Sequence, residues 1–164
     1  MGQTNLSALG GKAAMIQADL AVEEEAAGLI AQANEAIGPL SCLVNNASVF
    51  EKDTPETTTK ESWESHMQVN LRAPFQLIQS FIRQRPSDVE GNIINLIDQR
   101  VWNVTPFFTS YTVSKVALWG LTQNLALALA PSIRVNAIGP GPTLPSAHQT
   151  EEQFERQWSA QPLS

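Results

Sequence analysis

The 164-residue sequence has a single cysteine, Cys42, which excludes an intrachain disulfide and any metal site built from several thiolates. Charged residues are few, at 16%, while hydrophobic residues make up 43%, which excludes a disordered tail, a collagen-like fibre and a charge-rich coiled coil. Basic residues number 10 against 16 acidic ones. With a formal charge of −6, the chain is expected to bind neither nucleic acid nor an anionic membrane surface.

Signals for export and membrane insertion are also missing. The first residues, MGQTNLSALGG, contain no basic region followed by a long apolar run, and no stretch reaches the roughly 18 apolar residues of a membrane span. We therefore expect a cytoplasmic protein. His66 and His148 lie far apart without ligand-like spacing, so we expect no metal centre and assign both to surface or loop positions.

What the sequence does contain is an alternation of short apolar runs and longer helical patterns. The strands are predicted at 12–18, 40–44, 92–97 and 133–138. The helices are predicted at 22–37, 62–84, 111–130 and 151–158. Strands that alternate with helices imply right-handed crossovers, so the expected fold class is α/β with a parallel sheet. Cys42, within the apolar run 40–44, is predicted to be a small buried side chain.

Two of the predicted helices carry unusual apolar surfaces. In the helix at 62–84, six apolar side chains recur at helical spacing and are expected to share one face. They are Trp63, Met67, Leu71, Phe75, Ile78 and Ile82. The helix at 111–130 is apolar almost all round, which is typical of a helix buried between a sheet and a partner chain.

Polar side chains follow the predicted strands at the points where they end. They are Asp19, the segment 45–48, Asp98 and the segment 139–143. Ligands of open α/β sheets bind beyond the carboxyl ends of the strands, so these four stretches predict one shared site.

Tyr111, the only tyrosine, lies four residues before Lys115 at the start of a predicted helix, so the two share a face. A phenol with a pKa of about 10 is a poor proton donor or acceptor at neutral pH. A nearby ammonium lowers that pKa, and a tuned tyrosine can pass a proton to or from a carbonyl or imine.

Together, these motifs resemble the short-chain dehydrogenase/reductase family over nearly the whole chain. The family's NNAG pattern appears as NNAS at 45–48, and its helix asparagine corresponds to Asn70. Its YxxxK pair falls on Tyr111 and Lys115, and its PG turn falls at 140–141. The resemblance implies a Rossmann-like doubly wound sheet and hydride transfer with NADP (NADPH), or with NAD as the other possibility. The pteridine reductase subgroup, which the chain resembles at Asp98, favours NADPH.

The resemblance also assigns roles to individual residues. It makes Tyr111 the proton donor, Lys115 the group that lowers its pKa and holds the nicotinamide ribose, and Asn70 the support of a proton relay through water. The remaining cofactor contacts are Asp19 at the adenine, Asn45, Asn46 and Ala47 at the adenosine side, and Pro140, Gly141 and Thr143 at the nicotinamide end.

One position departs from the family pattern, because Asp98 stands where most members have a catalytic serine. An ionised carboxylate only accepts hydrogen bonds, so Asp98 suits a substrate that presents N–H groups. An aspartate before YxxxK resembles the pteridine reductase subgroup, which implies a pterin substrate, and Phe107 or Phe108 could stack on its flat ring or simply pack. The alternatives are a 3-oxoacyl or small-ketone reductase, in which Asp98 is a tolerated change, or an inactive relative.

A second departure concerns the family's Gly-rich turn, TGxxxGxG, which is absent from the sequence. That turn places backbone N–H groups against the cofactor pyrophosphate. Aligning Asp19 with the end of the family's third strand implies that about 50 residues of two leading units are missing. We therefore interpret residues 1–164 as a single partial Rossmann-like domain, which lacks the family's C-terminal end as well.

Two further expectations concern assembly. The resemblance implies that the helices at 62–84 and 111–130 pair across subunits, giving a homodimer or homotetramer. A chain without its cofactor turn could also be a non-catalytic fragment or a dimerising scaffold.

Overall fold

Short isoleucine- and valine-rich segments form the three strands of a parallel sheet in this computed structural model, which describes residues 12–145 and 149–160. The strands are β1 (Cys42–Asn45), β2 (Gly91–Leu96) and β3 (Ile133–Ile138). They lie in the order β1-β2-β3, with Asn45 opposite Asn95 and Leu96 opposite Ile138. The parallel α/β architecture is therefore confirmed.

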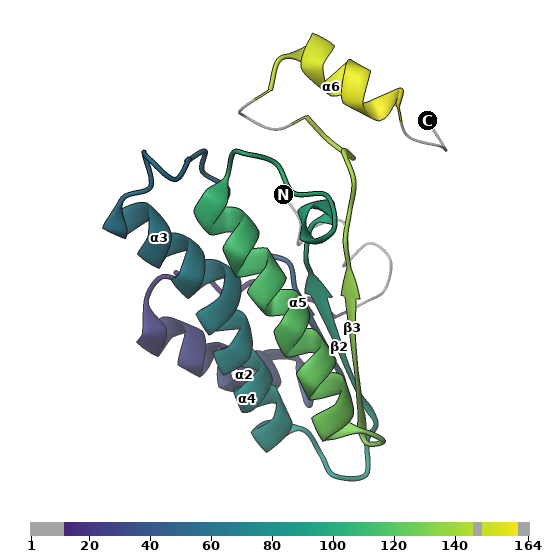
Figure 1. The fold of residues 1–164 in the computed structure, drawn as a ribbon. Helices are drawn as coiled ribbons and strands as arrows, with labels where there is room; N and C mark the ends of the chain where they lie inside the picture. The colour runs from purple at the N-terminus through teal and green to yellow at the C-terminus, as the bar shows by residue number, and fades with distance from the viewer. Residues whose placement is uncertain (1–11, 146–148, 161–164) are drawn as a thin grey trace.

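Helices connect the strands and follow the last of them (Figure 1). They are α2 (Glu23–Ile37), α3 (Lys60–Met67), the π-helix η1 (Gln68–Arg72), α4 (Ala73–Gln84), the 3-10 helix η2 (Gln99–Val101), α5 (Thr109–Leu129) and α6 (Glu151–Trp158). The predicted bounds of β3 and α6 match, and α2 ends as expected at Gly38, whose φ of 96° suits glycine. Within the described ranges, no helix is long and apolar enough to cross a membrane.

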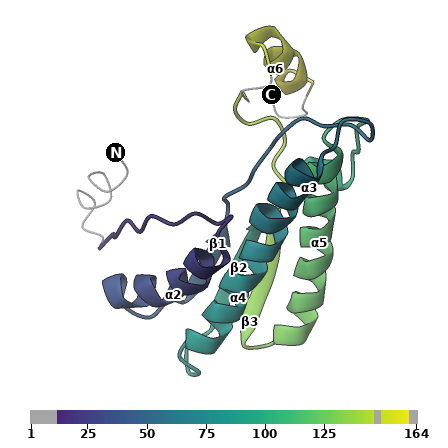
Figure 2. The same ribbon diagram turned by 90° about the vertical axis from the view of Figure 1, so that its left-hand side faces the viewer.

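The helices α2, α4 and α5 lie together on one side of the sheet (Figures 1 and 2). The hydrophobic core forms between them and the strands. Its buried members are Ile30, Leu77, Ile78, Phe81, Ile93, Leu125, Ile133 and Val135. Burying eight such side chains, each worth about 1.5–3 kcal/mol, is the main driving force for this arrangement.

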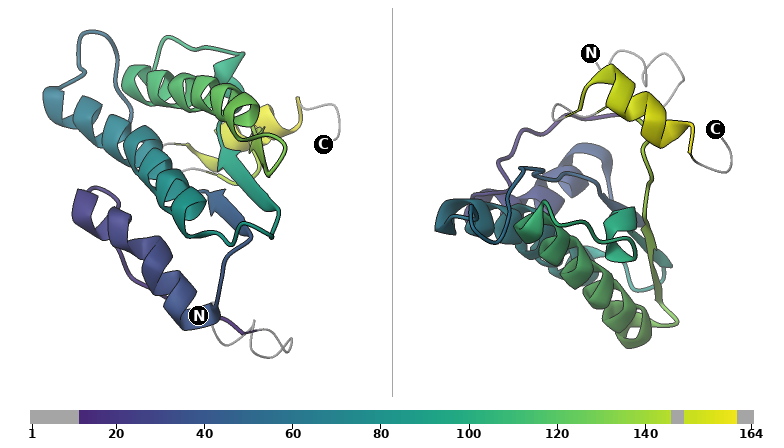
Figure 3. Two further views of the ribbon diagram at one scale, coloured as in Figure 1. Left: turned by 90° about the horizontal axis from the view of Figure 1, so that it is seen from below. Right: turned by 45° about the horizontal axis from the view of Figure 1, so that its top comes forward.

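The opposite face of the sheet is bare among the described residues, as the view from below also indicates (Figure 3). Val44 and Ile138 are each 52% exposed there. Cys42 is exposed as well, so the prediction that it is buried was wrong. Cys42 begins β1, which is an edge strand of the sheet within the described residues.

The predicted strand at 12–18 is also not formed. Residues 12–19 have no regular secondary structure, and the sheet contains no fourth strand within the described ranges. A strand needs a hydrogen-bonding partner, and this segment has none there. The pattern of residues 12–18 is that of an extended segment, but such a segment becomes a strand only when another strand pairs with it.

The predicted helix at 62–84 forms as one continuous helical segment, whose middle part is the π-helix η1 between α3 and α4. The expected single apolar face was therefore wrong, because the wider turn of η1 rotates the helix surface relative to a 3.6-residue repeat. Ile78 is fully buried in the core, whereas Trp63 is 39% exposed. Met67, Leu71 and Phe75 instead line an outward groove beside α5, with a volume of about 500 Å³.

Candidate active site

The carboxyl ends of the three parallel strands bring the predicted site together. Asp98 follows β2 by two residues, and Pro140 follows β3 by the same distance. Both line a cleft of about 580 Å³, together with Tyr111 of α5 and residues of α6. Asn45 ends β1 at the same edge of the sheet. Of the four stretches expected to share one site, Asp98 and the segment 139–143 contribute to the lining of this cleft, whereas Asp19 and the segment 45–48 do not.

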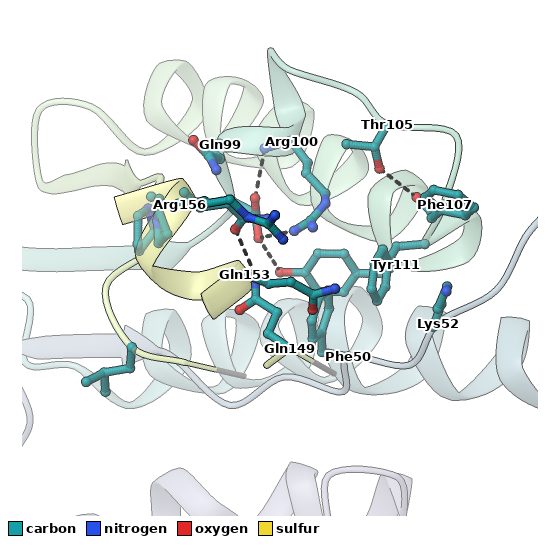
Figure 4. A pocket seen from close by; sticks show the side chains of 17 residues that line it. Phe50, Lys52, Gln99, Arg100, Thr105, Phe107, Tyr111, Gln149, Gln153 and Arg156 are labelled. Carbon is teal, nitrogen blue, oxygen red and sulfur yellow. Dashed lines mark hydrogen bonds and ion pairs between the residues drawn. The ribbon is translucent and has the colours of Figure 1, made fainter. Parts of the chain in front are cut away.

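Tyr111 and Asp98 are directly bonded in this cleft, where the phenol Oη donates to Asp98 Oδ2 at 2.9 Å. Asp98 also accepts from the backbone N–H of Arg100 at 2.8 Å, and its Oδ2 lies 3.4 Å from the Arg100 guanidinium. Tyr111 is buried, with 6% of its surface exposed. Figure 4 shows its hydroxyl directed into the cleft near Arg100.

Burial raises the pKa of Tyr111 above its ordinary value, and the charge and hydrogen bond of Asp98 raise it further, while Arg100 opposes them. The phenol is therefore held in its protonated form at neutral pH. The sequence had led us to expect a pKa lowered by Lys115. In this arrangement the carboxylate lies closer to the phenol than any ammonium does.

Lys115 lies one helical turn after Tyr111 and is 3% exposed. Its Nζ donates to the Leu96 carbonyl oxygen at 2.8 Å and lies 5.7 Å from the centre of the Tyr111 ring. Burial lowers the pKa of Lys115 to about 8, against a raising effect from Asp98. Two further N–H donors remain on this ammonium for a bound molecule.

Asn70 is part of the π-helix η1 and is 1% exposed. Its Oδ1 accepts from the Val49 N–H at 2.8 Å and from Ser48 Oγ at 3.1 Å. Its Nδ2 donates to the Val49 carbonyl at 3.0 Å and to Ser114 Oγ at 3.1 Å. The side chain therefore fastens the segment after β1 to α5, one residue before Lys115.

Asn45 begins a buried row of polar side chains that crosses the sheet. Its Nδ2 donates to Asn95 Oδ1 at 2.9 Å, and Asn95 donates in turn to Thr122 Oγ1 at 2.9 Å. Asn45 Oδ1 is buried without a hydrogen-bond partner. A lone buried acceptor at a strand end is a position where a ligand's donor would be stabilised.

The remaining predicted cofactor contacts lie nearer the surface. Asn46 and Ala47 are exposed beyond β1, and the exposed Asp19 caps the turn before α2 through a 2.9 Å bond from the Ala21 N–H. Thr143 Oγ1 donates to the Gly141 carbonyl at 2.9 Å. Pro140 and Gly141 line the cleft.

Aromatic rings form one wall of the cleft, and one of them was not anticipated from the sequence. Phe50 stacks on Phe108, with ring centres 4.4 Å apart and planes 6° apart, and meets Tyr111 edge-on at 4.7 Å. The predicted Phe107 is 45% exposed at the mouth, with Lys52 Nζ 5.0 Å from its ring centre. Phe50 could have been found as the first aromatic residue after the NNAS segment.

Cationic side chains that the sequence did not single out also line the cleft. They are Lys52, Arg100 and Arg156. Arg100 lies over the rings of Phe50 and Phe108, at 5.3 and 4.9 Å from their centres. No group of three metal-ligating side chains occurs within the described residues.

Comparison with known proteins gives consistent matches to one family. The family model for short chain dehydrogenases matches residues 2–156. An uncharacterized oxidoreductase from Thermotoga maritima is 35% identical over 139 residues, covering 84% of this chain and 55% of the relative. A probable galactose dehydrogenase, GalD, from Rhizobium meliloti is 35% identical over 127 residues, covering 77% of this chain and 50% of its own length.

Solved structures resemble the chain closely as well. FolM alternative dihydrofolate reductase 1 from Brucella canis, complexed with NADP, is 49% identical with a TM-score of 0.92, covering 98% of this chain and 63% of that one. A blue fluorescent protein from a metagenomic library, in complex with NADPH, is 33% identical with a TM-score of 0.81, covering 90% and 61%. The chain thus spans about half to two-thirds of the length of the proteins it matches.

Proposed function

This chain belongs to the short chain dehydrogenase family, and we propose that the complete protein is a reductase that transfers hydride from NADPH to a pterin. The observation that carries the substrate class is the carboxylate of Asp98, 2.9 Å from the Tyr111 hydroxyl inside the cleft. A pterin ring presents amino and ring N–H donors, and a carboxylate accepts several of them at once. The alternative dihydrofolate reductases from Brucella species, 48–49% identical to this chain, support the same class.

The cofactor end of the proposal is supported by two unused groups. Lys115 retains N–H donors after its bond to Leu96, and Asn45 Oδ1 is a buried acceptor without a partner. Ribose hydroxyls both accept and donate, so this donor and acceptor set fits the nucleoside parts of NADPH. When bound, NADPH supplies the hydride. The described residues supply no pyrophosphate cradle, which we expect from further residues of the complete protein.

We propose that Tyr111 donates its hydroxyl proton to the carbonyl or imine group that is reduced. Its raised pKa keeps that proton on Oη at neutral pH. When substrate N–H groups bind Asp98, they replace the Tyr111 hydroxyl as donors to Oδ2. The phenol is then free to donate to the substrate, and the N–H donors weaken the effect of the carboxylate charge that opposes its ionisation.

The mechanism is tested by steady-state reduction of a dihydropterin and of a 3-oxoacyl thioester by the full-length protein. Tyr111→Phe removes only the hydroxyl, so we expect turnover to fall by on the order of 100-fold or more while NADPH binding is retained. Undiminished turnover in this variant would sink the mechanism.

A second candidate is a 3-oxoacyl or small-ketone reductase. The specific observation in its favour is that a relative 35% identical to this chain is named a probable galactose dehydrogenase, so the scaffold is compatible with hydroxyl and carbonyl substrates. Asp98→Ser separates the two candidates. Improved ketone turnover would favour the second, and collapse of pterin turnover the first.

A non-catalytic scaffold and an oligomer are both suggested by the outward groove between η1 and α5. The groove is lined by Met67, Leu71, Phe75 and Leu121, and Val116 of α5 is 43% exposed. We propose that it forms the interface of a homodimer or homotetramer. Titration of the chain with NADPH, followed by cofactor fluorescence, addresses the scaffold: tight saturable binding would refute a purely structural role.

A further inference from the structure

A buried polar cluster next to Tyr111 has no part in the reaction described above. It consists of Asp53 from the loop after β1, His66 from α3 and Ser110 from the first turn of α5, which are 3%, 0% and 0% exposed. Ser110 Oγ bonds to Asp53 Oδ2 and lies 2.8 Å from His66 Nδ1. The histidine that we had assigned to the surface is therefore fully buried. Burying three polar side chains costs free energy unless they are hydrogen-bonded, so their arrangement calls for an explanation.

Asp53 provides the N-terminal cap that α5 lacks. The residue at the cap position, Phe108, has a φ of 62° and no capping side chain. The Asp53 carboxylate accepts instead from the Ser110 N–H at 3.3 Å, and the backbone carbonyl oxygen of Asp53 accepts from the Phe108 N–H at 2.7 Å. Thr58 Oγ1 donates to the same carboxylate at 3.0 Å. A negative charge at this end also interacts favourably with the helix dipole.

Burial acts to raise the pKa of Asp53, but the hydrogen bonds from Ser110 and Thr58 outweigh it, so the pKa lies below its ordinary value. The carboxylate is thus ionised and only accepts. Consequently the Ser110 hydroxyl must donate to Asp53, which leaves its lone pairs free to accept from His66.

The partners of His66 define one tautomer. Nε2 lies 3.1 Å from the Glu51 N–H, which can only donate, so this nitrogen carries no proton. Nδ1 lies 2.9 Å from the Ser62 carbonyl, which can only accept, so this nitrogen carries the proton. The hydrogen bonds therefore run in one direction, from the Glu51 amide to His66, then to Ser110, and finally to Asp53.

Two members of this chain of hydrogen bonds, Ser110 and Glu51, adjoin residues that wall the cleft. Ser110 directly precedes Tyr111, whose ring centre is 6.0 Å from that of His66. Glu51 directly follows Phe50, whose ring meets Tyr111 edge-on. We propose that Asp53, His66 and Ser110 are positioning residues, which lock the first turn of α5 to the Phe50 segment and thereby fix Tyr111 in the cleft. The catalytic consequence rests on the proposed function, whereas the cluster itself does not.

The structural half of the proposal is tested on the chain without substrate. Nitrogen-15 NMR should show His66 as the neutral Nδ1–H tautomer; an Nε2–H tautomer would overturn the assignment. Asp53→Asn should make amide exchange at Ser110 at least about tenfold faster, as expected for loss of a charged cap. Asp88→Asn, the same change at an exposed aspartate, should leave exchange unchanged. Equal exchange in both variants would refute the cap.

The kinetic half uses the full-length protein. Asp53→Asn and Ser110→Ala should each lower kcat by about tenfold without changing KM for NADPH, and the double variant should lose no more than the worse single one. Multiplied losses, or losses confined to KM, would overturn the positioning role. If the wild-type protein reduces no pterin, the proposed function fails, but the tautomer and exchange results still decide the cluster.

Discussion

At the scale of single residues, the protonation of one phenol governs the cleft. Tyr111 is held protonated by its burial and by Asp98, and burial lowers the pKa of Lys115 to about 8. The pKa of Tyr111 is therefore raised and that of Lys115 is lowered, whereas a simple ammonium–phenolate pair would lower the first and raise the second. Binding of a substrate to Asp98 is the event that would release the phenol.

Asp98→Asn removes the negative charge while keeping a side chain of the same shape. We expect the pKa of Tyr111 to fall, because one of the two main causes of its elevation is gone. The phenolate absorbance of Tyr111 should then appear at a lower pH than in the unmodified chain, with Tyr111→Phe subtracted as the blank. An unchanged titration would show that Asp98 does not act on the phenol.

Lys115 makes stability depend on pH in a defined window. Its amine titrates near 10.5 when unfolded and near 8 when folded, so the unfolded chain binds more protons between these values. The free energy of unfolding should therefore rise from about pH 8 to about pH 10.5, by on the order of 3 kcal/mol. Urea denaturation at stepped pH measures the rise, which should be missing in Lys115→Met.

The residues that sequence reasoning found and those it missed differ in a physical way. Tyr111 and Lys115 share a helix and are recognisable by spacing, and Asp98 ends a recognisable strand. Phe50 and His66 act through partners about 45 to 60 positions away in the sequence. Such contacts depend on how the loops pack, which local periodicity does not encode.

At the scale of elements, the π-helix η1 connects two helices that point their apolar sides differently. The segment from Gln68 to Arg72 bears Asn70, whose side chain binds the segment after β1 on one side and α5 on the other. The periodicity predicted a helix throughout this region correctly. It could not predict the wider turn, because η1 has no sequence pattern of its own.

Asn70→Ala should therefore destabilise the chain strongly. Four hydrogen bonds of a side chain that is 1% exposed are lost, and buried partners such as the Val49 N–H are left unsatisfied. We expect a loss of about 2–4 kcal/mol in the free energy of unfolding by urea denaturation. Asn103→Ala, at an exposed position, is the matched control, and an equal loss there would contradict the role of Asn70.

Element boundaries were predictable where breakers and caps mark them. The glycine and proline at 38–39 end α2, and the predicted run 133–138 forms β3 with the same bounds. The segment 12–18 failed as a strand for the opposite reason, since its pattern was adequate but the described chain offers it no partner.

At the scale of the whole molecule, charge is unevenly distributed. The chain carries a formal charge of −6, yet the described lining of the cleft contains Lys52, Arg100 and Arg156 against a single acid, Asp98. Figure 4 shows Lys52 and Arg156 on opposite sides of Tyr111. A substrate with an anionic extension should be preferred over a neutral one. The cytoplasmic location stays a prediction from the sequence.

The preference is measured in the full-length protein with a pterin bearing a carboxylated side chain and one without it. Raising ionic strength about tenfold should increase KM for the carboxylated substrate by about threefold and leave the neutral one unaffected. Lys52→Gln combined with Arg156→Gln should abolish the difference. Lys60→Gln, an exposed lysine paired with Glu64, should preserve it.

Among the described residues, one face of the sheet and the outer edge of β1 are uncovered. An unpaired edge strand is a template for another strand, and Val44 and Ile138 offer an apolar surface beside it. Expressed alone, the 164 residues should self-associate in a concentration-dependent way, visible by analytical ultracentrifugation. A separate polypeptide that pairs with the edge of β1 should suppress that association by complementation.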